Sequence, residues 1–466
     1  MPSEPTAVGI FDFDNHYYEA EDAFTRHADR SLRNRGVRWA DIDGRRRLLV
    51  GGTLNSYIAN PVFDPVAKPG ALFDWYRGNP QRQGIVEAFG ELEPIRPEYR
   101  DRDVRFKVMG DQGLDGTLLF PTLGVGIEDA LEHDPEACAK VFEAFNRWLE
   151  DDWGYRYEGR IFAVPYIALV EPVAAAAELR RVIEAGAVAV NVRAAPVAVP
   201  GGRQSPFDTA FDEIWGLAAE AGIAVATHAG IDAYDPLVQM WEPGGAESSL
   251  FRSPLRGIVT KGRGVSDFYA AALCHKVFDR FPGLRFASVE NGASWVPDML
   301  HRLDDAANRN PGFFAEHPRE QFGEHVWITP FWEDDVAALL ADVRADRLLL
   351  GSDWPHAEGT REPADFVSES LVGLPDATVQ QIARQTGAVP ALVENDLSQR
   401  LRGDVGRRGV VLHVHFLPVA DPAGELFEGD VAAFLGVVEL AAVVALDQSH
   451  HVFSLRRELT EISGAG

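Results

Sequence analysis

Two carboxylates and an imidazole alternate near the start of the sequence, in the stretch FDFDNHYYE. They are Asp12, Asp14 and His16. Because successive side chains of a β-strand point to opposite faces, we expect these three to share one face, with Phe11, Phe13 and Asn15 on the other. A carboxylate on a buried face is costly unless it has a partner. A divalent metal ion is the partner that this combination of groups suggests.

Further metal donors lie at the ends of other apolar runs. The run IAVATH ends in His228, and Asp353 follows the run LLLGS. Two imidazoles and two carboxylates suit Zn²⁺ or Mn²⁺ and leave a coordination position for water or substrate. We therefore predict one divalent ion, Zn or Mn, held by Asp14, His16, His228 and Asp353.

Each of these residues also has a simpler interpretation. Asp353 could form a turn or cap a helix before Pro355, and His228 could be a hydrogen-bonded core histidine. Asp14 and His16 could satisfy local backbone groups at the end of a strand. For Asp353 and His228 taken alone, the simpler interpretation is preferable. The metal site is favoured because the simpler interpretations would require several unrelated polar residues to lie at the ends of the first, fifth and eighth strands by chance.

Short apolar runs alternate with helical periodicity, which is typical of repeated βα units around a parallel sheet. We predict strands at residues 7–14, 116–122, 160–169, 187–193, 223–228, 284–290, 325–330 and 347–353. Helices are predicted at residues 134–153, 172–186 and 206–222. Eight such units favour an α/β fold, a (β/α)8 TIM barrel, which gathers its chemistry at the C-terminal strand ends. A doubly wound sheet is less favoured, because TLGVGIED and GIVTKGR are poor phosphate loops.

The remaining length has to lie in insertions and a tail. Residues 20–114 and 229–265 would be long insertions after strands 1 and 5, placed over the mouth of the barrel. We predict a barrel domain at residues 1–404 and a C-terminal extension of unassigned role at residues 405–466. The tail holds GVVLHVHFL, whose His413 and His415 imitate a metal motif. Too little chain follows for a barrel, so a surface or packing strand is the better interpretation.

Composition limits the partners. The 466 residues include 71 acidic and 44 basic side chains, for a net charge of -27, which argues against nucleic acid and anionic membranes as partners. Cys138 and Cys274 form no CxxC pair and are predicted to be buried structural thiols. The start MPSEPTAVGI lacks a signal peptide, and the apolar tract at residues 430–446 is interrupted by Glu439. A cytoplasmic protein is predicted, and a homodimer remains open.

One loop is rich in positive charge. The stretch FRSPLRGIVTKGRG at residues 251–264 carries Arg252, Arg256, Lys261 and Arg263. Over the mouth of an acidic protein, Arg256 and Arg263 could bind the carboxylate of a small-molecule substrate. Arg193, at the end of the fourth predicted strand, is a further candidate. Neutralisation of nearby acidic side chains is an equally good explanation.

Four stretches together resemble a known family: FDFDNHYYE, THAG, KVFDRFPGLRFASVENGASWVP and LLLGSDWPHAEG. They are similar to the amidohydrolase superfamily, in the amidohydrolase-related branch typified by aminocarboxymuconate semialdehyde decarboxylase, over residues 7–400. The resemblance implies a metal-dependent TIM barrel enzyme with the same four ligands, Asp14 standing where a first histidine is often found. It makes Glu19 an added ligand or an orienting group, although a carboxylate at a helix N-terminus is the simpler interpretation.

The sequence departs from the family after the sixth strand, where relatives usually have a histidine that activates water. Here Glu290 and Asn291 precede a glycine. Asparagine can orient a water molecule but cannot accept its proton, so His356 or Glu290 would have to substitute. By analogy to the family, non-oxidative decarboxylation of a small aromatic or unsaturated carboxylic acid, with His356 as the acid, is placed ahead of hydrolysis of an amide, ester or lactone. A catalytically silent barrel that binds metal and serves as a binding protein is the alternative of another class.

Overall fold

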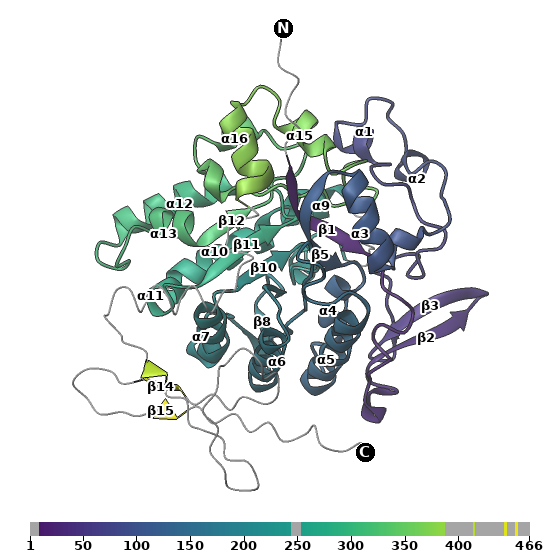
Figure 1. The fold of residues 1–466 in the computed structure, drawn as a ribbon, viewed down its shortest axis with the longest axis horizontal. Helices are drawn as coiled ribbons and strands as arrows, with labels where there is room; N and C mark the ends of the chain where they lie inside the picture. Colours follow the sequence, from purple (N-terminus) through teal and green to yellow (C-terminus); the bar gives the residue numbers. More distant parts are fainter. Residues whose placement is uncertain (1–8, 244–252, 387–412, 415–441, 445–452, 455–466) are drawn as a thin grey trace, which may run out of the picture. The chain divides into compact units, whose positions relative to one another are not determined.

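The computed structural model describes residues 9–243 and 253–386 and three short strands near the C-terminus (Figure 1). Contacts divide the chain into two compact units, Met1–Asn395 and Asp396–Gly466. The described residues of the second unit form an antiparallel sheet of β13 (His413–Val414), β14 (Ala442–Val444) and β15 (Phe453–Ser454). His415 and the predicted boundary at residues 404 and 405 lie outside the described residues.

The first unit is built on parallel strands, as predicted. Two sheets have the orders β1-β5-β6 and β12-β11-β10-β7. The strands are β1 (Ile10–Tyr17), β5 (Leu114–Pro121), β6 (Ile161–Ala163), β7 (Ala189–Asn191), β10 (Ala224–His228), β11 (Arg285–Val289) and β12 (Val326–Ile328). Each lies within a predicted strand or overlaps most of one. The α/β class is therefore confirmed.

Isolated backbone pairs connect these sheets. Tyr166, just after β6, pairs in parallel with Asn191 of β7, and Ile328 of β12 pairs with Leu348. The backbone N–H of Phe13 donates to the carbonyl of Leu350 at 2.8 Å. The eighth predicted strand, residues 347–353, is therefore present as a segment between β12 and β1, although it has too few paired residues to be assigned as a strand.

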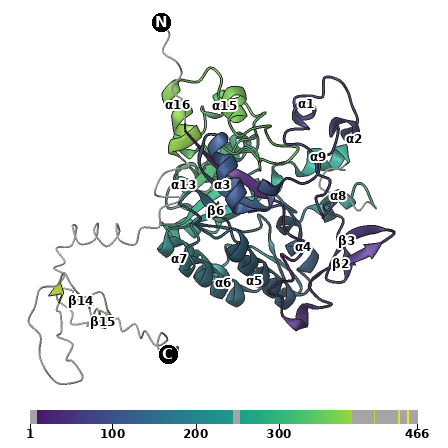
Figure 2. The ribbon, with the colours of Figure 1, turned by 45° about the vertical axis from the view of Figure 1, so that its right-hand side comes forward.

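Helices cover the outside of the strands. Figure 2 shows α5, α6 and α7 side by side along one face. The longer helices are α3 (Arg102–Asp111), α5 (Pro135–Asp152), α6 (Pro172–Glu184), α7 (Asp212–Ala221), α10 (Arg263–Cys274), α12 (Val296–Arg309) and α13 (Pro318–His325). The three predicted helices are confirmed as α5, α6 and α7. Gly222 ends α7 with φ +66°, a backbone conformation that glycine adopts without strain.

Two long segments between strands carry smaller elements. After β1 come a three-stranded antiparallel sheet and the short helices α1 and α2, followed by α3. After β10 come two more helices, on either side of a stretch outside the described residues. The bounds are β2 (Val37–Ile42), β3 (Arg45–Val50), β4 (Thr53–Leu54), α1 (Phe73–Tyr76), α2 (Ile85–Ala88), α8 (Asp235–Gln239) and α9 (Pro254–Thr260).

The predicted alternation of side chains is wrong for β1. Phe11 and Phe13 do not face the helices: they pack in an apolar cluster to which all seven parallel strands contribute. Asp12 points away from that cluster and accepts hydrogen bonds from Ser352 and Asn15. The reason is a β-bulge, since three steps along β1, from Asp12 to Asn15, match two steps along β5. One extra residue reverses the faces beyond it.

The cysteines differ from each other. Cys138 in α5 is buried, as predicted, whereas Cys274 at the end of α10 is exposed, so its predicted burial is wrong. The buried stripe of α10 runs through Phe268, Tyr269, Ala272 and Leu273, and Cys274 lies on the opposite, exposed face, seven residues from the exposed Asp267. None of the helices in the described residues is long and apolar enough to cross a membrane.

A buried arginine on α3 holds the C-terminal end of β1. Arg105 is fully buried, and its Nη1 and Nη2 each donate at 2.5 Å, to Asn15 Oδ1 and to the carbonyl of His16. Its Nε donates to the carbonyl of Glu98 at 2.8 Å, and its guanidinium lies 4.3 Å from the ring centroid of Trp354. The planar fork of an arginine can serve all of these acceptors at once.

Replacement of this arginine by alanine should therefore be strongly destabilising. Arg105→Ala leaves buried acceptors at Asn15 and His16 without donors and opens a cavity, so we expect the free energy of unfolding to fall by about 3–5 kcal/mol. Urea unfolding followed by circular dichroism measures this loss. Lys107→Ala, at an exposed position of the same helix, should change stability by less than about 0.5 kcal/mol. Equal effects of the two substitutions would contradict the proposed support of β1.

Candidate functional site

A cavity of about 820 Å³ lies over the C-terminal ends of the parallel strands. Its floor includes the last residues of β1 and β10 and the residues that follow β5, β11 and the eighth segment. Its walls come mainly from residues 57–92, after β1, and residues 229–265, after β10. The two long segments thus border the end of the sheets at which the sequence predicts chemistry.

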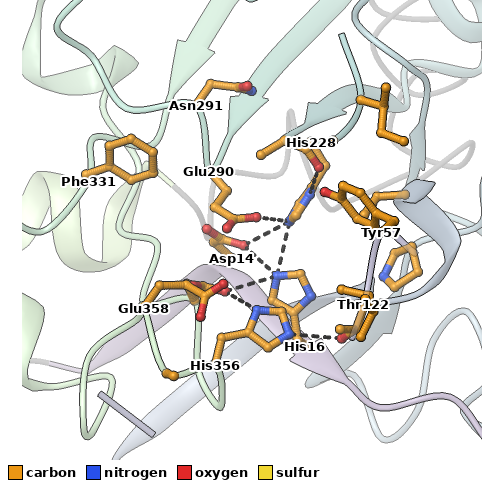
Figure 3. A pocket seen from close by; sticks show the side chains of 18 of the residues that line it. Asp14, His16, Tyr57, Thr122, His228, Glu290, Asn291, Phe331, His356 and Glu358 are labelled. Atoms are coloured by element: carbon orange, nitrogen blue, oxygen red, sulfur yellow. Dashed lines mark hydrogen bonds and ion pairs between the residues drawn. The ribbon is translucent and has the colours of Figure 1, made fainter. Parts of the chain in front are cut away.

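The predicted metal donors gather in this cavity (Figure 3). The Nε2 atoms of His16 and His228 are 3.1 Å apart, and each lies 3.4 Å from Asp14 Oδ1. Asp353 Oδ1 lies 3.3 Å from His16 Nε2. Asp14, His16 and His228 form one group that could hold a metal ion, and His16 also belongs to a second group with Asp353 and His356. All four predicted ligands line this one cavity and His16 is shared by the two groups, but no single group among the described residues contains all four.

The arrangement of donor and acceptor atoms in this cluster is better suited to binding a cation than to hydrogen bonding within the cluster. His228 Nδ1 contacts the carbonyl of Ala229 at 2.9 Å, so Nδ1 carries the proton and Nε2 directs its lone pair into the cluster. Asp14 Oδ1 is buried and has no hydrogen-bond partner. Several electron-pair donors facing each other in a buried site is what a metal ion would require.

A third group of possible metal ligands adjoins the first two. It consists of Glu290, Asp353, His356 and Glu358. Glu290 Oε2 lies 3.2 Å from His228 Nε2, and His356 Nδ1 lies 2.6 Å from Asp353 Oδ1. Both sequence-predicted substitutes for the missing histidine, Glu290 and His356, are therefore beside the donor cluster.

Two of these carboxylates belong to residues with an unusual backbone conformation. Glu290 directly follows β11 and Asp353 is the last residue of the eighth segment, and their φ angles are +54° and +55°. Non-glycine residues rarely adopt this left-handed conformation, and where they do the strain is often functional. Gly351 lets the eighth segment approach β1, because a Cβ atom there would lie 2.7 Å from Asp14 Cβ.

The two carboxylates nearest His228 are both buried, yet their pKa values are shifted in opposite directions. Burial raises the pKa of Asp14, but contacts with the imidazoles of His16 and His228 outweigh burial and lower that pKa below its ordinary value. Burial and the neighbouring carboxylates of Asp353 and Asp14 hold the pKa of Glu290 well above its ordinary value. The site therefore distinguishes a carboxylate that stays ionised from a carboxyl group that favours its proton.

Asn291 is not brought to the cluster. Its Nδ2 donates to the carbonyls of Thr227 and Val289, at 2.8 and 2.9 Å, and Figure 3 shows its side chain directed away from the donors. Its amide ties together the ends of β10 and β11. The predicted role of Asn291 in orienting water finds no support in this geometry and stays a prediction.

Arg193 lines the cavity but already has acidic partners. Its Nη2 pairs with Asp129, its Nη1 donates to Glu132 at 3.0 Å, and its Nε donates to the carbonyl of Ile231 at 2.6 Å. The simpler interpretation, that this arginine neutralises nearby acids, describes these contacts. The predicted contact of Arg193 with a substrate carboxylate stays a prediction.

In the predicted carboxylate-binding loop, the cationic residue that lines the cavity is not one of the two arginines that the sequence suggested. Arg256 pairs with Asp235, and Arg263 lies 3.5 Å from Asp267 and stacks on Tyr234. Neither lines the cavity, whereas Lys261 does. Arg252 lies outside the described residues. Lys261 and Arg193 are the cationic side chains, histidines apart, among the described residues that line the cavity.

The carboxylate of Glu19 lies at the N-terminus of a short helical turn, which is the simpler of the two interpretations of this residue. Its Oε1 accepts hydrogen bonds from the backbone N–H groups of Leu123 and Gly124, at 2.8 and 3.0 Å, where a short helical turn begins. Its Oε2 is buried without a partner. Burial raises the pKa of Glu19 to about 7, although the two backbone hydrogen bonds oppose that shift.

This carboxyl group should make stability depend on pH. A carboxyl whose pKa is higher in the folded chain keeps a proton that the unfolded chain releases, so its contribution is full below pH 4.5 and is lost as pH rises through 7. The loss can reach about 3 kcal/mol. Glu19→Gln should abolish this part of the decline, measured by urea unfolding at pH 5 and pH 7.5. Glu91→Gln, at an exposed position, should leave the decline unchanged, and the idea fails if both variants keep the wild-type slope.

With the site described, the chain can be compared with known proteins. The family model described as Amidohydrolase matches residues 92–388. The chain belongs to the amidohydrolase family. An amidohydrolase from Mycobacterium avium subsp. paratuberculosis K-10 supports this, with 36% identity, a TM-score of 0.78, and coverage of 82% of this chain and 99% of that chain. No curated protein matches the chain.

More distant amidohydrolase-like structures share the fold. A 2,6-dihydroxybenzoate decarboxylase in complex with 2,6-dihydroxybenzoate is 18% identical, with a TM-score of 0.50 over 67% of this chain and 94% of that chain. The apo form of IDCase from Metarhizium anisopliae is 15% identical, with a TM-score of 0.50 over 83% of this chain and 97% of that chain. At these identities the two matches show a shared fold.

The sequence analysis missed Thr122. Its Oγ1 lies 2.9 Å from His356 Nε2. The signal was available, because Thr122 is the polar residue that ends the apolar run GTLLFPT, just as Asp14, His228 and Asp353 end theirs. Threonine was overlooked because it is a poor metal ligand and a common strand residue.

Proposed function

We propose that this amidohydrolase family member is a divalent-metal-dependent carboxy-lyase that removes CO₂ from a small aromatic or unsaturated carboxylic acid. The observation that carries the proposal is the buried meeting of imidazole nitrogens and carboxylate oxygens, with Asp14 Oδ1 lacking a hydrogen-bond partner. Asp14, His16, His228 and Asp353 would hold one Zn²⁺ or Mn²⁺. The ion would supply positive charge that polarises the substrate and stabilises the negative charge developing in the reaction.

Glu290 is the proposed proton donor. When the bond from the substrate carbon to its carboxylate breaks, the electron pair stays on that carbon, which must then take up a proton. Glu290 Oε2 faces His228 Nε2 at 3.2 Å and so borders the space beside the donors. His356 is less suited, because its two ring nitrogens already contact Asp353 and Thr122. A positioned acid of this kind contributes to proton transfer in the transition state.

The apolar wall of the cavity suits a ring. Most of it comes from the segment between β1 and α3, and its members are aromatic or aliphatic. They include Tyr57, Ile58, Phe63, Val66, Trp75, Ile85, Phe89 and Leu92. A cavity of this kind binds a mainly apolar ligand and leaves orientation to a few polar groups. Lys261 is the best placed cation to meet a carboxylate, since Arg193 has acidic partners.

We also propose that the two sheets and the eighth segment form one (β/α)8 barrel. The parallel pairs between Tyr166 and Asn191 and between Ile328 and Leu348 support this order. So does the contact of Phe13 with Leu350, which joins the eighth segment to the first strand. A barrel would account for the single apolar cluster that all seven parallel strands share.

Hydrolysis of a neutral ester, amide or lactone is the second candidate. The observation that favours it is the charge of the cavity, where acidic side chains outnumber the two cationic ones; the acidic residues are Asp14, Asp232, Glu290, Glu333, Asp353 and Glu358. A neutral substrate would meet less repulsion than a carboxylate. Glu290, in its ionised form, could then take a proton from water.

Product analysis separates these functions. The protein is loaded with Mn²⁺ or Zn²⁺ and incubated separately with aromatic carboxylic acids and with aryl esters, lactones and amides. Release of CO₂ together with the protonated ring supports the carboxy-lyase. Formation of acid from the neutral compounds, without CO₂ from the acids, replaces it with the hydrolase. Close to one bound ion per chain with neither reaction would favour the binding protein of another class.

A further inference from the structure

A row of hydrogen bonds connects the ends of β1, β5 and the eighth segment beneath the donor cluster. Thr122 Oγ1 donates to the carbonyl of Tyr17 at 2.8 Å and contacts His356 Nε2 at 2.9 Å. His356 Nδ1 in turn lies 2.6 Å from Asp353 Oδ1. Thr122 is buried, and it is one residue beyond the end of β5.

The direction of these bonds can be worked out from the groups themselves. A carbonyl oxygen can only accept, so the one hydroxyl hydrogen of Thr122 is used by Tyr17. Thr122 Oγ1 must then accept, and His356 Nε2 must carry the hydrogen between them. The hydroxyl group therefore selects the ring orientation in which Nδ1 faces Asp353, and a second hydrogen, carried by Nδ1 or by the carboxyl group, lies between those two atoms.

The same oxygen of Asp353 connects this row to the donor cluster. Asp353 Oδ1 contacts both His356 Nδ1 and, at 3.3 Å, His16 Nε2. The His356 ring also packs against His16 in a tilted arrangement, with ring centroids 4.0 Å apart, and its centroid lies 5.6 Å from that of Tyr18. Rotation of the His356 ring would therefore remove a contact that fixes Asp353.

We propose that Thr122 is a positioning residue of the metal centre, which acts by orienting His356 and, through it, the carboxylate of Asp353. The proposal rests on the metal site of the proposed function. Groups that hydrogen-bond to metal ligands fix their geometry, and their removal typically lowers metal affinity 10- to 100-fold. Thr122 would affect metal affinity in the same way, although it contacts the predicted ligand Asp353 only through His356.

Two substitutions separate the hydroxyl group from the rest of the side chain. Thr122→Val keeps the shape and removes the hydroxyl, so its affinity for Mn²⁺ should fall by about 10- to 100-fold. Thr122→Ser keeps the hydroxyl and should bind Mn²⁺ nearly as the wild type does. Mn²⁺ titration by calorimetry on the metal-stripped full chain gives the affinity without any need for substrate. Thr122→Ala provides a second hydroxyl-free variant should valine disturb folding.

A matched control and a double substitution test the route of the effect. Thr117, buried in the same strand, donates to a backbone carbonyl and does not line the cavity, so Thr117→Val should leave Mn²⁺ affinity unchanged. If Thr122 acts through His356, Thr122→Val should add no further loss in a His356→Ala background. An equal loss in both backgrounds would overturn the proposal.

The outcomes also distinguish this proposal from the proposed function. Wild-type protein that binds Mn²⁺ together with Thr122→Val and Thr122→Ala variants of unchanged affinity overturns the role of Thr122 and leaves the metal site intact. Wild-type protein that binds neither Mn²⁺ nor Zn²⁺ overturns the metal site and the role of Thr122 with it. Loss in the valine and alanine variants, with rescue by serine, supports the role of the hydroxyl group.

Discussion

Replacement of Asp14 by asparagine is expected to remove the bound metal ion and reduce turnover to background. Asp14 Oδ1 is the buried oxygen without a hydrogen-bond partner, and it lies 3.4 Å from the Nε2 atoms of both His16 and His228. Asparagine has the same shape but lacks the negative charge that a divalent ion requires here. Mn²⁺ affinity should fall by more than about 100-fold, the upper end of the effect of groups that only support ligands.

Elemental analysis and Mn²⁺ titration measure this loss, and thermal melting of metal-free protein checks the fold. Because contacts with His16 and His228 stabilise the ionised form of Asp14, the metal-free variant should melt below the metal-free wild type but still unfold cooperatively. Asp111→Asn, at an exposed position at the end of α3, should retain metal and activity. An Asp14→Asn variant that purifies with close to one tightly bound ion per chain would remove Asp14 from the ligand set.

Glu290→Gln should have the second large effect, and it should act on catalysis without removing the metal. Glutamine keeps the size of the side chain and its contact with His228, but it cannot deliver a proton. Loss of a positioned acid typically costs a factor of about 10²–10⁴, so we expect kcat to fall by this amount while KM and Mn²⁺ content change little. Steady-state kinetics with the substrate identified by product analysis measures both parameters.

A second carboxyl group of the cavity provides the comparison for Glu290. Glu333 also lines the cavity, and burial raises its pKa to about 7. Glu333 belongs to none of the possible metal-binding groups among the described residues, so Glu333→Gln should lower kcat far less. If Glu290→Gln keeps wild-type kcat while His356→Gln loses it, the proton donor is His356, as the sequence analysis placed it.

The positions of the candidate metal donors could be predicted from sequence because parallel strands share a direction. Asp14, His228 and Asp353 each end an apolar run and His16 follows two residues after Asp14, and the C-terminal ends of such runs meet at one edge. No assumption about distant contacts was needed. The same rule applied to Thr122 would have found it as well.

The inner and outer faces of β1 could not be predicted in this way. The bulge between Asp12 and Asn15 depends on Ser352, whose backbone and hydroxyl groups bind the Asp12 carboxylate from a strand far along the chain. Alternation in the sequence of β1 contains no sign of that partner. The ion pairs of the predicted carboxylate-binding arginines could not be predicted for a similar reason. The acidic residues that pair with Arg193 and Arg256 come from other segments of the chain.

The helix α3 limits how the substrate range of this protein could be engineered. It belongs to the same long segment as the apolar wall, yet its Arg105 anchors the strand that carries Asp14 and His16. Transplanting the whole segment from a relative would therefore risk the catalytic centre together with the specificity. A transplant confined to residues 57–92 would exchange the wall and leave the anchor in place.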